Sequence, residues 1–378
     1  MNTAAKVKAV VLYLVMPLAV IIELYGGWLS SPLLGEDFEG GVWRAGRDVL
    51  SGHSPYPHLP LGPIPSGHVP FVYPPTALSF GVPLSFLPLP AAGAVWAALL
   101  FAACASTLWI LDVRDWRCYA LGLISVPVIE GVILGNITLL LLPGVALAWR
   151  WRDRPVAVAL VVGCLVALKP FFWPLCFWLL ITGRRRSAVV AGEVAIAALL
   201  GSWAAIGFDG FRGYPELLAA VAHKTGTESY SIMSLATGLG SSRGVGQIVE
   251  YAAGFGLLAM AVVVARREDG DRRALSVVLI ATLCLTPLVH RHYFALLILM
   301  IAMRDREISA AWLIPVVFLF RPLLPLHPPV LNGLPYQRDP ADIASVLVLA
   351  ALTLVLMLGV RGGERSERRS PAPALEPA

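Results

Sequence analysis

Residues Val7 to Leu29 read VKAVVLYLVMPLAVIIELYGGWL, an apolar run long enough to cross a bilayer as one helix. Lys6 and Lys8 give this run the charged start of a secretory signal peptide. No small-x-small cleavage pattern follows it, and further apolar runs come after it. We therefore interpret the segment as a retained membrane anchor.

The composition extends this interpretation to the rest of the chain. Of the 378 residues, 57% are hydrophobic and only 14% are charged, and apolar runs recur along the whole length. We predict an all-α polytopic membrane protein with about twelve transmembrane elements, some of them short hairpins. These elements form a single domain over residues 1–360, and the charged, Pro- and Ala-rich tail 361–378 is expected to be disordered.

The basic residues predict how the chain is threaded through the membrane. The net charge of +5 is spread over short arginine clusters between apolar runs, which does not favour nucleic acid as a partner. One path keeps 20 of the 29 Lys and Arg residues on the cytoplasmic side, together with both chain ends. Its inside loops are 112–117, 150–154, 184–186, 266–273 and 304–307. The loops 31–74, 208–244 and 321–340 then face outward.

Three apolar stretches on this path are too short for two full spans. The stretches 119–149, 155–183 and 273–303 must each cross and return, although two spans need about 40 residues. We expect short or tilted hairpins that turn at Gly135-Asn136, Lys169-Pro170 and His290-Arg291-His292. A rival threading makes the first two stretches single long helices and places the arginines of 150–154 outside.

The first outer loop opens on an acidic turn, Gly35-Glu36-Asp37-Phe38-Glu39. From Phe38 to Leu50 the apolar residues fall on one helical face and the charged residues on another, which predicts an amphipathic helix at the membrane interface. Asp37 lies at the start of this helix. Its carboxylate is a candidate general base, with Glu36 as the fallback, or else a simple helix cap.

The order of the motifs resembles glycosyltransferase family 87. The acidic turn is followed by Gly52-His53-Ser54-Pro55-Tyr56 and then by Tyr73-Pro74-Pro75. Three segments further along resemble the family's Gly-Gln-(Val/Ile)-Asn-Leu turn, its Lys-Pro turn and its Ser-Pro-x-x-x-x-His segment: Gly135-Asn136-Ile137-Thr138-Leu139, Leu168-Lys169-Pro170, and Thr286-Pro287 with His292. Asn136 stands where the family usually has Gln, Thr138 where Asn is common, and His290-Arg291 where a Trp-containing pair is usual.

The resemblance implies a GT-C type fold and an integral enzyme of the bacterial plasma membrane. Such an enzyme transfers a sugar, mannose or arabinofuranose in the best-known relatives, from a polyprenyl-phosphate donor to a lipid-linked or cell-envelope glycan acceptor on the outer face. The resemblance also implies that Asp37 is the general base and that His292 is a second functional residue.

Transfer from a lipid phosphosugar also needs positive charge beside the departing phosphate. The candidates are Lys169, Arg291 and His292 on the hairpin turns, with Arg44 and Arg321 at the interface. We expect the substrate to be lined by Glu36, Tyr56, Tyr73, Asn136, His290 and Tyr230, although the tyrosines also suit an aromatic belt. Neither the carboxylates nor the five cysteines have metal-ligand spacing, so metal-independent transfer without a cofactor is predicted.

A multi-span transporter or a lipid-carrier flippase is the alternative function. Buried charges and broken helices are typical of transporters as well. Transporters usually have two corresponding halves, however, and the first outer loop has no equivalent in the second half of this chain.

Overall fold

The structure is a computed structural model that describes residues 35–57, 59–60, 70–286, 288–317 and 338–359. The predicted anchor at Val7 to Leu29, the tail and Arg321 lie outside the described residues. Within those residues every regular element is helical and none is a strand, which confirms the all-α prediction.

The helices begin and end as follows: α3 Glu36–Phe38, the π-helix η2 Glu39–Trp43, α4 Arg44–Leu50, η3 Pro75–Ala77, α5 Leu78–Leu84, α6 Leu89–Ile110, α7 Trp116–Leu123, α8 Val126–Leu134, α9 Thr138–Arg150, α10 Pro155–Leu168, η4 Pro170–Phe172, α11 Pro174–Ile181, α12 Arg185–Ala205, α13 Tyr214–Thr225, η5 Gly226–Glu228, α14 Ile232–Gly238, α15 Arg243–Ala265, α16 Gly270–Cys284, η6 Arg291–Phe294, α17 Ala295–Arg304, η7 Ala310–Leu313, α18 Ile314–Val317 and α19 Pro340–Leu358.

Four of these helices, α6, α12, α15 and α19, are long and apolar enough to cross a membrane. Helices α7 and α8 pass the same test together but are bent by 53° at their junction, so the described residues hold four or five candidate spans. A membrane protein is therefore supported, whereas the expected number of about twelve transmembrane elements is not confirmed. The expected hairpins are built from shorter helices, such as α9 and α10.

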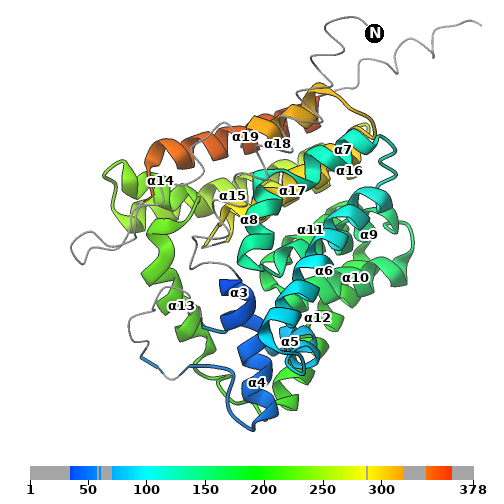
Figure 1. The fold of residues 1–378 in the computed structure, drawn as a ribbon. Helices are drawn as coiled ribbons and strands as arrows, with labels where there is room; N and C mark the ends of the chain where they lie inside the picture. Colours follow the sequence, from blue (N-terminus) through cyan, green and yellow to red (C-terminus); the bar gives the residue numbers. More distant parts are fainter. Residues whose placement is uncertain (1–34, 58, 61–69, 287, 318–337, 360–378) are drawn as a thin grey trace, which may run out of the picture.

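The helices pack as two groups that share a buried centre. Helices α15, α16, α17 and α19 lie side by side in one group, and α6, α9, α10 and α12 form the other (Figure 1). All but the last residue of α17 are buried, as expected for a helix that is apolar on every side. Helix α17 contacts α6 and α9 as well as α16 and α19, so it joins the two groups.

Ion pairs show that the stretch 119–149 starts and finishes on the same face of the molecule. Arg150 at the end of α9 is paired with Asp112, which follows α6, at 2.6 Å. Arg306, after α17, lies 3.7 Å from the same carboxylate. Three predicted inside loops therefore meet, and the chain between 119 and 149 turns back instead of forming one long helix.

The stretch 155–183 also starts and finishes on this face of the molecule. Arg184, before α12, is paired with Asp153 at 2.8 Å and with Asp271 at the start of α16 at 2.6 Å. Its Nε also donates to the main-chain oxygen of Arg152. The rival threading is thus wrong, because it would place 150–154 and 184–186 on opposite faces. We call the face that carries these pairs the basic face.

The three predicted turns are breaks in the helices. Helix α8 ends before Gly135, α10 ends before Lys169, and an irregular segment follows α16 until η6 begins at Arg291. Because α9 runs from the first break to the basic face, the break lies at the opposite end of that helix. The polar residues of the three breaks can therefore gather away from the basic face.

The first outer loop begins with a continuous helical run, since α3, η2 and α4 follow one another without interruption from Glu36 to Leu50. A helix is confirmed here, and Phe38, Val42 and Ala45 are buried as the pattern predicts. The buried face packs against protein, however. Gly46 and α5 approach so closely that a Cβ on Gly46 would lie 2.4 Å from the Gly81 oxygen.

A candidate active site around Asp37

The acidic turn is docked on the end of α8. Gly35 adopts the left-handed conformation, with φ of 71°, and its N–H donates to the Ile133 oxygen at 2.7 Å. The Phe38 ring stacks on Trp96 with their centroids 5.2 Å apart. The N-cap of α3 is Gly35 and receives no side-chain cap, so Asp37 is not a helix cap. Its carboxylate remains available for another purpose.

Asp37 and Asn136 come together although 99 positions separate them. The Asn136 amide donates from Nδ2 to Asp37 Oδ2 at 2.6 Å and to the Tyr73 hydroxyl at 3.3 Å. Its Oδ1 accepts from the Thr138 main-chain N–H at 2.9 Å. A main-chain N–H can only donate, so this contact fixes which way the amide points. Among the described residues, no donor reaches the other oxygen of Asp37, Oδ1.

Lys169 lies on the far side of Asn136. Its Nζ donates to Thr138 Oγ1 at 2.5 Å and lies 4.0 Å from the centroid of the Tyr293 ring. Only 8% of Lys169 is exposed. An ammonium group buried in this way needs acceptors or aromatic faces, and the hydroxyl and the ring supply both.

The segment from His290 to Tyr293 brings two imidazoles into the same region. The rings of His290 and His292 are parallel within 6°, with centroids 5.5 Å apart, and His292 also packs against Tyr293. His292 is fully buried, and neither of its nitrogens has a hydrogen-bond partner among the described residues. Most buried polar atoms in folded proteins have a hydrogen-bond partner, so this imidazole stands out among the buried polar groups of the site.

Arg291 lies in a second polar group beside the first. Its Nε is 3.4 Å from Glu130 Oε2 on α8 and donates to the Tyr230 hydroxyl at 3.0 Å. Arg338, near the end of the last outer loop, donates to the same hydroxyl at 2.8 Å and lies over the Tyr230 ring. Two guanidinium groups therefore converge on one phenol oxygen.

The two groups act on each other electrostatically. Burial raises the pKa of the Asp37 carboxyl above its ordinary value, and the negative charge of Glu130 adds to this effect. The hydrogen bond from Asn136 and the positive charge of Lys169 act in the opposite direction, but they do not cancel the cost of burial. A carboxylate with a raised pKa and one open oxygen is suited to accept a proton.

The structure brings together six predicted site residues with Asp37, namely Tyr73, Asn136, Lys169, Tyr230, Arg291 and His292, and His290 lies against His292. Glu36 is next to Asp37 and partly buried. Arg44 is 46% exposed in its side chain and is paired with Glu39 at 2.6 Å. Tyr56 belongs to a different cluster.

Tyr56 holds the first outer loop in place. Its ring stacks on Trp203 of α12, and its hydroxyl donates to the Tyr73 main-chain oxygen at 2.9 Å. Tyr214 of α13 packs edge-on against the same ring. These contacts occupy both the ring and the hydroxyl, so the described contacts of Tyr56 are structural.

Sequence reasoning missed four residues of the site, namely Thr138, Glu130, Arg338 and Tyr293. Thr138 is a departure from the family motif, and Glu130, which precedes the first turn, could pair with a nearby cation or line the acceptor cavity but is more often structural at such a position. Arg338 lies near the end of the outer loop 321–340, and no motif around it predicts a function for this arginine. Tyr293 belongs to none of the motifs. The only sequence feature that points to it is its position directly after His292 in the predicted turn.

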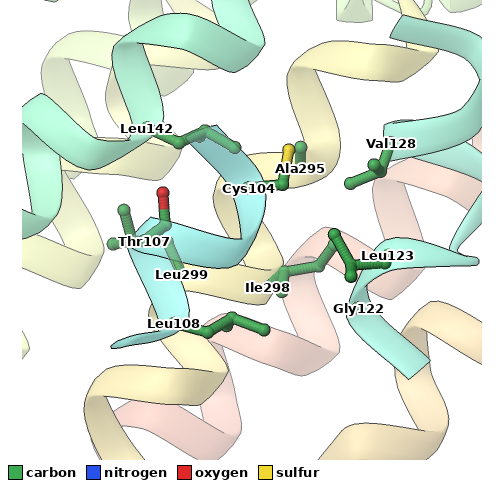
Figure 2. A pocket seen from close by; sticks show the side chains of 10 residues that line it. All are labelled: Cys104, Thr107, Leu108, Gly122, Leu123, Val128, Leu142, Ala295, Ile298 and Leu299. Atoms are coloured by element: carbon green, nitrogen blue, oxygen red, sulfur yellow. The ribbon is translucent and has the colours of Figure 1, made fainter. Parts of the chain in front are cut away.

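Other features of the molecule do not provide a comparable site. In the ranges that the structure describes, no group of three His, Cys, Asp or Glu residues could hold a metal ion. A cavity of about 10 Å³ between α6, α7 and α17 has walls that are almost wholly apolar, including Leu108, Val128 and Ile298 (Figure 2). It is large enough for about one water molecule and is a packing defect.

Fold and site together define an all-helical membrane protein with a polar site at the breaks between its helices. Over residues 71–290, more than half of its length, the chain matches glycosyltransferase family 87, and it belongs to that family. It is therefore a glycosyltransferase, as the order of its motifs predicts. The matched region contains Asn136, Lys169, Tyr230 and His290, whereas His292 lies directly after it and Asp37 well before it. No curated protein and no solved structure matches the chain.

Proposed function

We propose that this glycosyltransferase moves a sugar from a polyprenyl-phosphate donor to a hydroxyl group of a lipid-linked or cell-envelope glycan. Mannose and arabinofuranose are the candidate sugars. The enzyme works at the outer face of the bacterial plasma membrane, with both chain ends in the cytoplasm. The observation that carries the proposal is the Asp37 carboxylate: Asn136 donates to one of its oxygens, and no donor among the described residues reaches the other.

In the proposed step the acceptor hydroxyl attacks the anomeric carbon of the sugar. Oδ1 of Asp37 takes the hydroxyl proton. The bond between the anomeric carbon and the phosphate oxygen breaks, and its electron pair leaves with the lipid phosphate. The raised pKa of Asp37 makes its carboxylate a stronger base than an exposed aspartate.

The phosphate is assigned to Arg291 and Arg338. Their guanidinium groups meet at the Tyr230 hydroxyl, so an anion placed there would be shared by two planar donors. The His292 ring lies close to Tyr293 and His290, and neither of its nitrogens has a hydrogen-bond partner among the described residues. Arg44 is not assigned to the phosphate because Glu39 already neutralises it. Two guanidinium groups can supply the charge without a metal ion, so chelating agents are expected to leave the rate unchanged.

The test uses membranes that contain the protein and labelled polyprenyl-phosphate mannose or arabinofuranose. The wild-type protein is expected to form a glycosidic product from one of them, and Asp37→Asn to form none at equal protein level. Full activity of Asp37→Asn would remove Asp37 from the base role. Movement of a solute or of the lipid carrier without any glycosidic product would favour the transporter or flippase instead.

A further inference from the structure

Lys169, Thr138, Asn136 and Asp37 form a continuous series of hydrogen bonds. Lys169 Nζ is 2.5 Å from Thr138 Oγ1, Thr138 Oγ1 is 2.6 Å from Asn136 Oδ1, and Asn136 Nδ2 is 2.6 Å from Asp37 Oδ2. The residues come from three separate places in the chain, namely the acidic turn, the break after α8 and the break after α10.

The direction of every bond in this series is fixed. The Thr138 main-chain N–H identifies Oδ1 of Asn136 as the carbonyl oxygen, which can only accept. The Thr138 hydroxyl must therefore donate its single proton to Oδ1, and its oxygen is left to accept from Lys169. At the other end, the Asn136 NH₂ group donates to the carboxylate.

We propose that Lys169 is a positioning residue for the Asp37 carboxylate, acting through Thr138 and Asn136, and not a ligand of the donor phosphate. The proposal rests on the proposed function, in which Asp37 is the base. It revises the expectation that Lys169 binds the phosphate. Lys169 donates to Thr138 and faces the Tyr293 ring, so its ammonium group already interacts with residues on the Asp37 side of the site.

The series also orders the amide beside Asp37. Asn136 receives two hydrogen bonds on Oδ1, from the N–H and the hydroxyl of Thr138, and these hold its NH₂ group toward Asp37 and Tyr73. Hydrogen bonds arranged in series polarise one another in a buried site. Loss of the hydroxyl therefore weakens the hold on Asn136 and removes the acceptor of Lys169.

Other titratable groups face Asp37 and are kept unchanged in the test. Glu130 on α8, Tyr73 in the first outer loop and Tyr293 in η6 interact electrostatically with Asp37, and Glu36 is its neighbour in the chain. The variants alter only the series itself. Thr138→Val removes the hydroxyl at nearly constant volume, and Thr138→Ser retains it.

The experiment measures kcat/KM against pH, and the KM for the labelled lipid donor, for full-length protein in membranes. Thr138→Val is expected to move the acidic limb of the profile upward by about one pH unit, which lowers kcat/KM on that limb about tenfold. Thr138→Ser should restore the wild-type profile. Lys169→Met should move the limb in the same direction, with the KM for the donor changed less than twofold.

The proposal would be overturned if Thr138→Val left the pH profile of kcat/KM unshifted. It would also be overturned if Lys169→Met raised the KM for the donor without shifting the acidic limb. Thr138→Ala is a second variant with the same expected profile, so a folding failure of one variant leaves the test intact. Asp37→Asn is assayed in parallel. If it is inactive while Thr138→Val keeps the wild-type profile, only the series fails, whereas an active Asp37→Asn contradicts the proposed function itself.

Discussion

The main chain at Gly135 passes so close to Phe38 that a Cβ atom on the glycine would lie 2.6 Å from the Cβ of Phe38. The same glycine has φ of 71° and ends α8, so the next residue, Asn136, is presented to Asp37. This contact joins the acidic turn to the break after α8. The alignment of the base therefore depends on a residue without a side chain.

Gly135→Ala is expected to abolish most of the activity, because the added methyl group pushes the acidic turn away from Asn136. Gly183→Ala is a matched control, since Gly183 also has a positive φ of 86° but has nothing within 4 Å of the added Cβ. The control should cost about 1 kcal/mol of stability from backbone strain and keep the wild-type rate. Equal activity of the two variants would contradict the role given to the contact.

The raised pKa of Asp37 predicts how activity depends on pH. As the pH falls through this pKa the carboxylate becomes protonated and cannot take a proton, so kcat/KM should decline at a higher pH than for an ordinary aspartate. The measurement is a pH profile of glycosyl transfer in membranes. A decline only near the ordinary aspartate pKa would show that Asp37 is not the titrating base.

The same shift predicts that Asp37 reduces stability. A folded-state pKa above the unfolded value means that the contribution of this group is most favourable below the unfolded pKa and is lost as the pH rises through the folded pKa. Asp37→Asn cannot ionise and still accepts from Asn136. At pH 8 the purified variant should therefore have a Tm equal to or above that of the wild type, and a Tm several degrees lower would contradict the prediction.

Removal of Arg291 tests the phosphate side of the site. Arg291→Met alone would leave Glu130 as a partly buried carboxylate without its guanidinium partner, so the double variant Arg291→Met/Glu130→Gln is the better probe. We expect its kcat/KM for the lipid donor to fall about a hundredfold, as for the loss of one strong transition-state donor. Arg44→Ala is the control with an unchanged rate, because Arg44 is half exposed and paired with Glu39.

Arg184 joins several segments of the basic face, and its removal tests the contribution of this face to stability. Its guanidinium group bonds Asp153, Asp271 and the Arg152 oxygen. Arg184→Ala is expected to lower the free energy of unfolding by about 2 kcal/mol, read as a lower Tm in detergent. The neighbouring Arg186→Ala, at an exposed position, should leave the Tm unchanged. Activity per folded molecule should be the same in both variants.

Sequence patterns predicted the positions of the turns because the physical constraints there are local. A stretch of about 30 apolar residues between two basic clusters has to turn near its middle, and Gly135, Lys169-Pro170 and the His290 segment are the polar breaks available there. The helix from Glu36 to Leu50 was predictable for the same reason, since its apolar spacing is regular.

The contacts across the site were not predictable in this way. That Asn136 meets Asp37, or that Arg338 meets Arg291, depends on how helices far apart in the chain pack, and no residue spacing encodes it. Tyr56 illustrates the reverse case, because an aromatic residue in a polar outer loop suits sugar stacking, yet here it packs on Trp203. The expected number of about twelve transmembrane elements is not confirmed, because several apolar stretches of the described residues form helices shorter than a full span.

Helix α9 gives a measure of the distance between the break after α8 and the basic face. It begins at Thr138 and ends at Arg150, and its 13 residues rise by roughly 20 Å, whereas the hydrocarbon core of a bilayer is about 30 Å thick. In the proposed topology, with the basic face at the cytoplasmic interface and Asp37 as the base, the Asp37 carboxylate lies within the outer leaflet and not at its surface. The phosphate of the proposed lipid donor would then have to move below the membrane surface toward the guanidinium groups of the site, while its isoprenoid chain stays in lipid. We therefore expect the rate of transfer to depend on bilayer thickness.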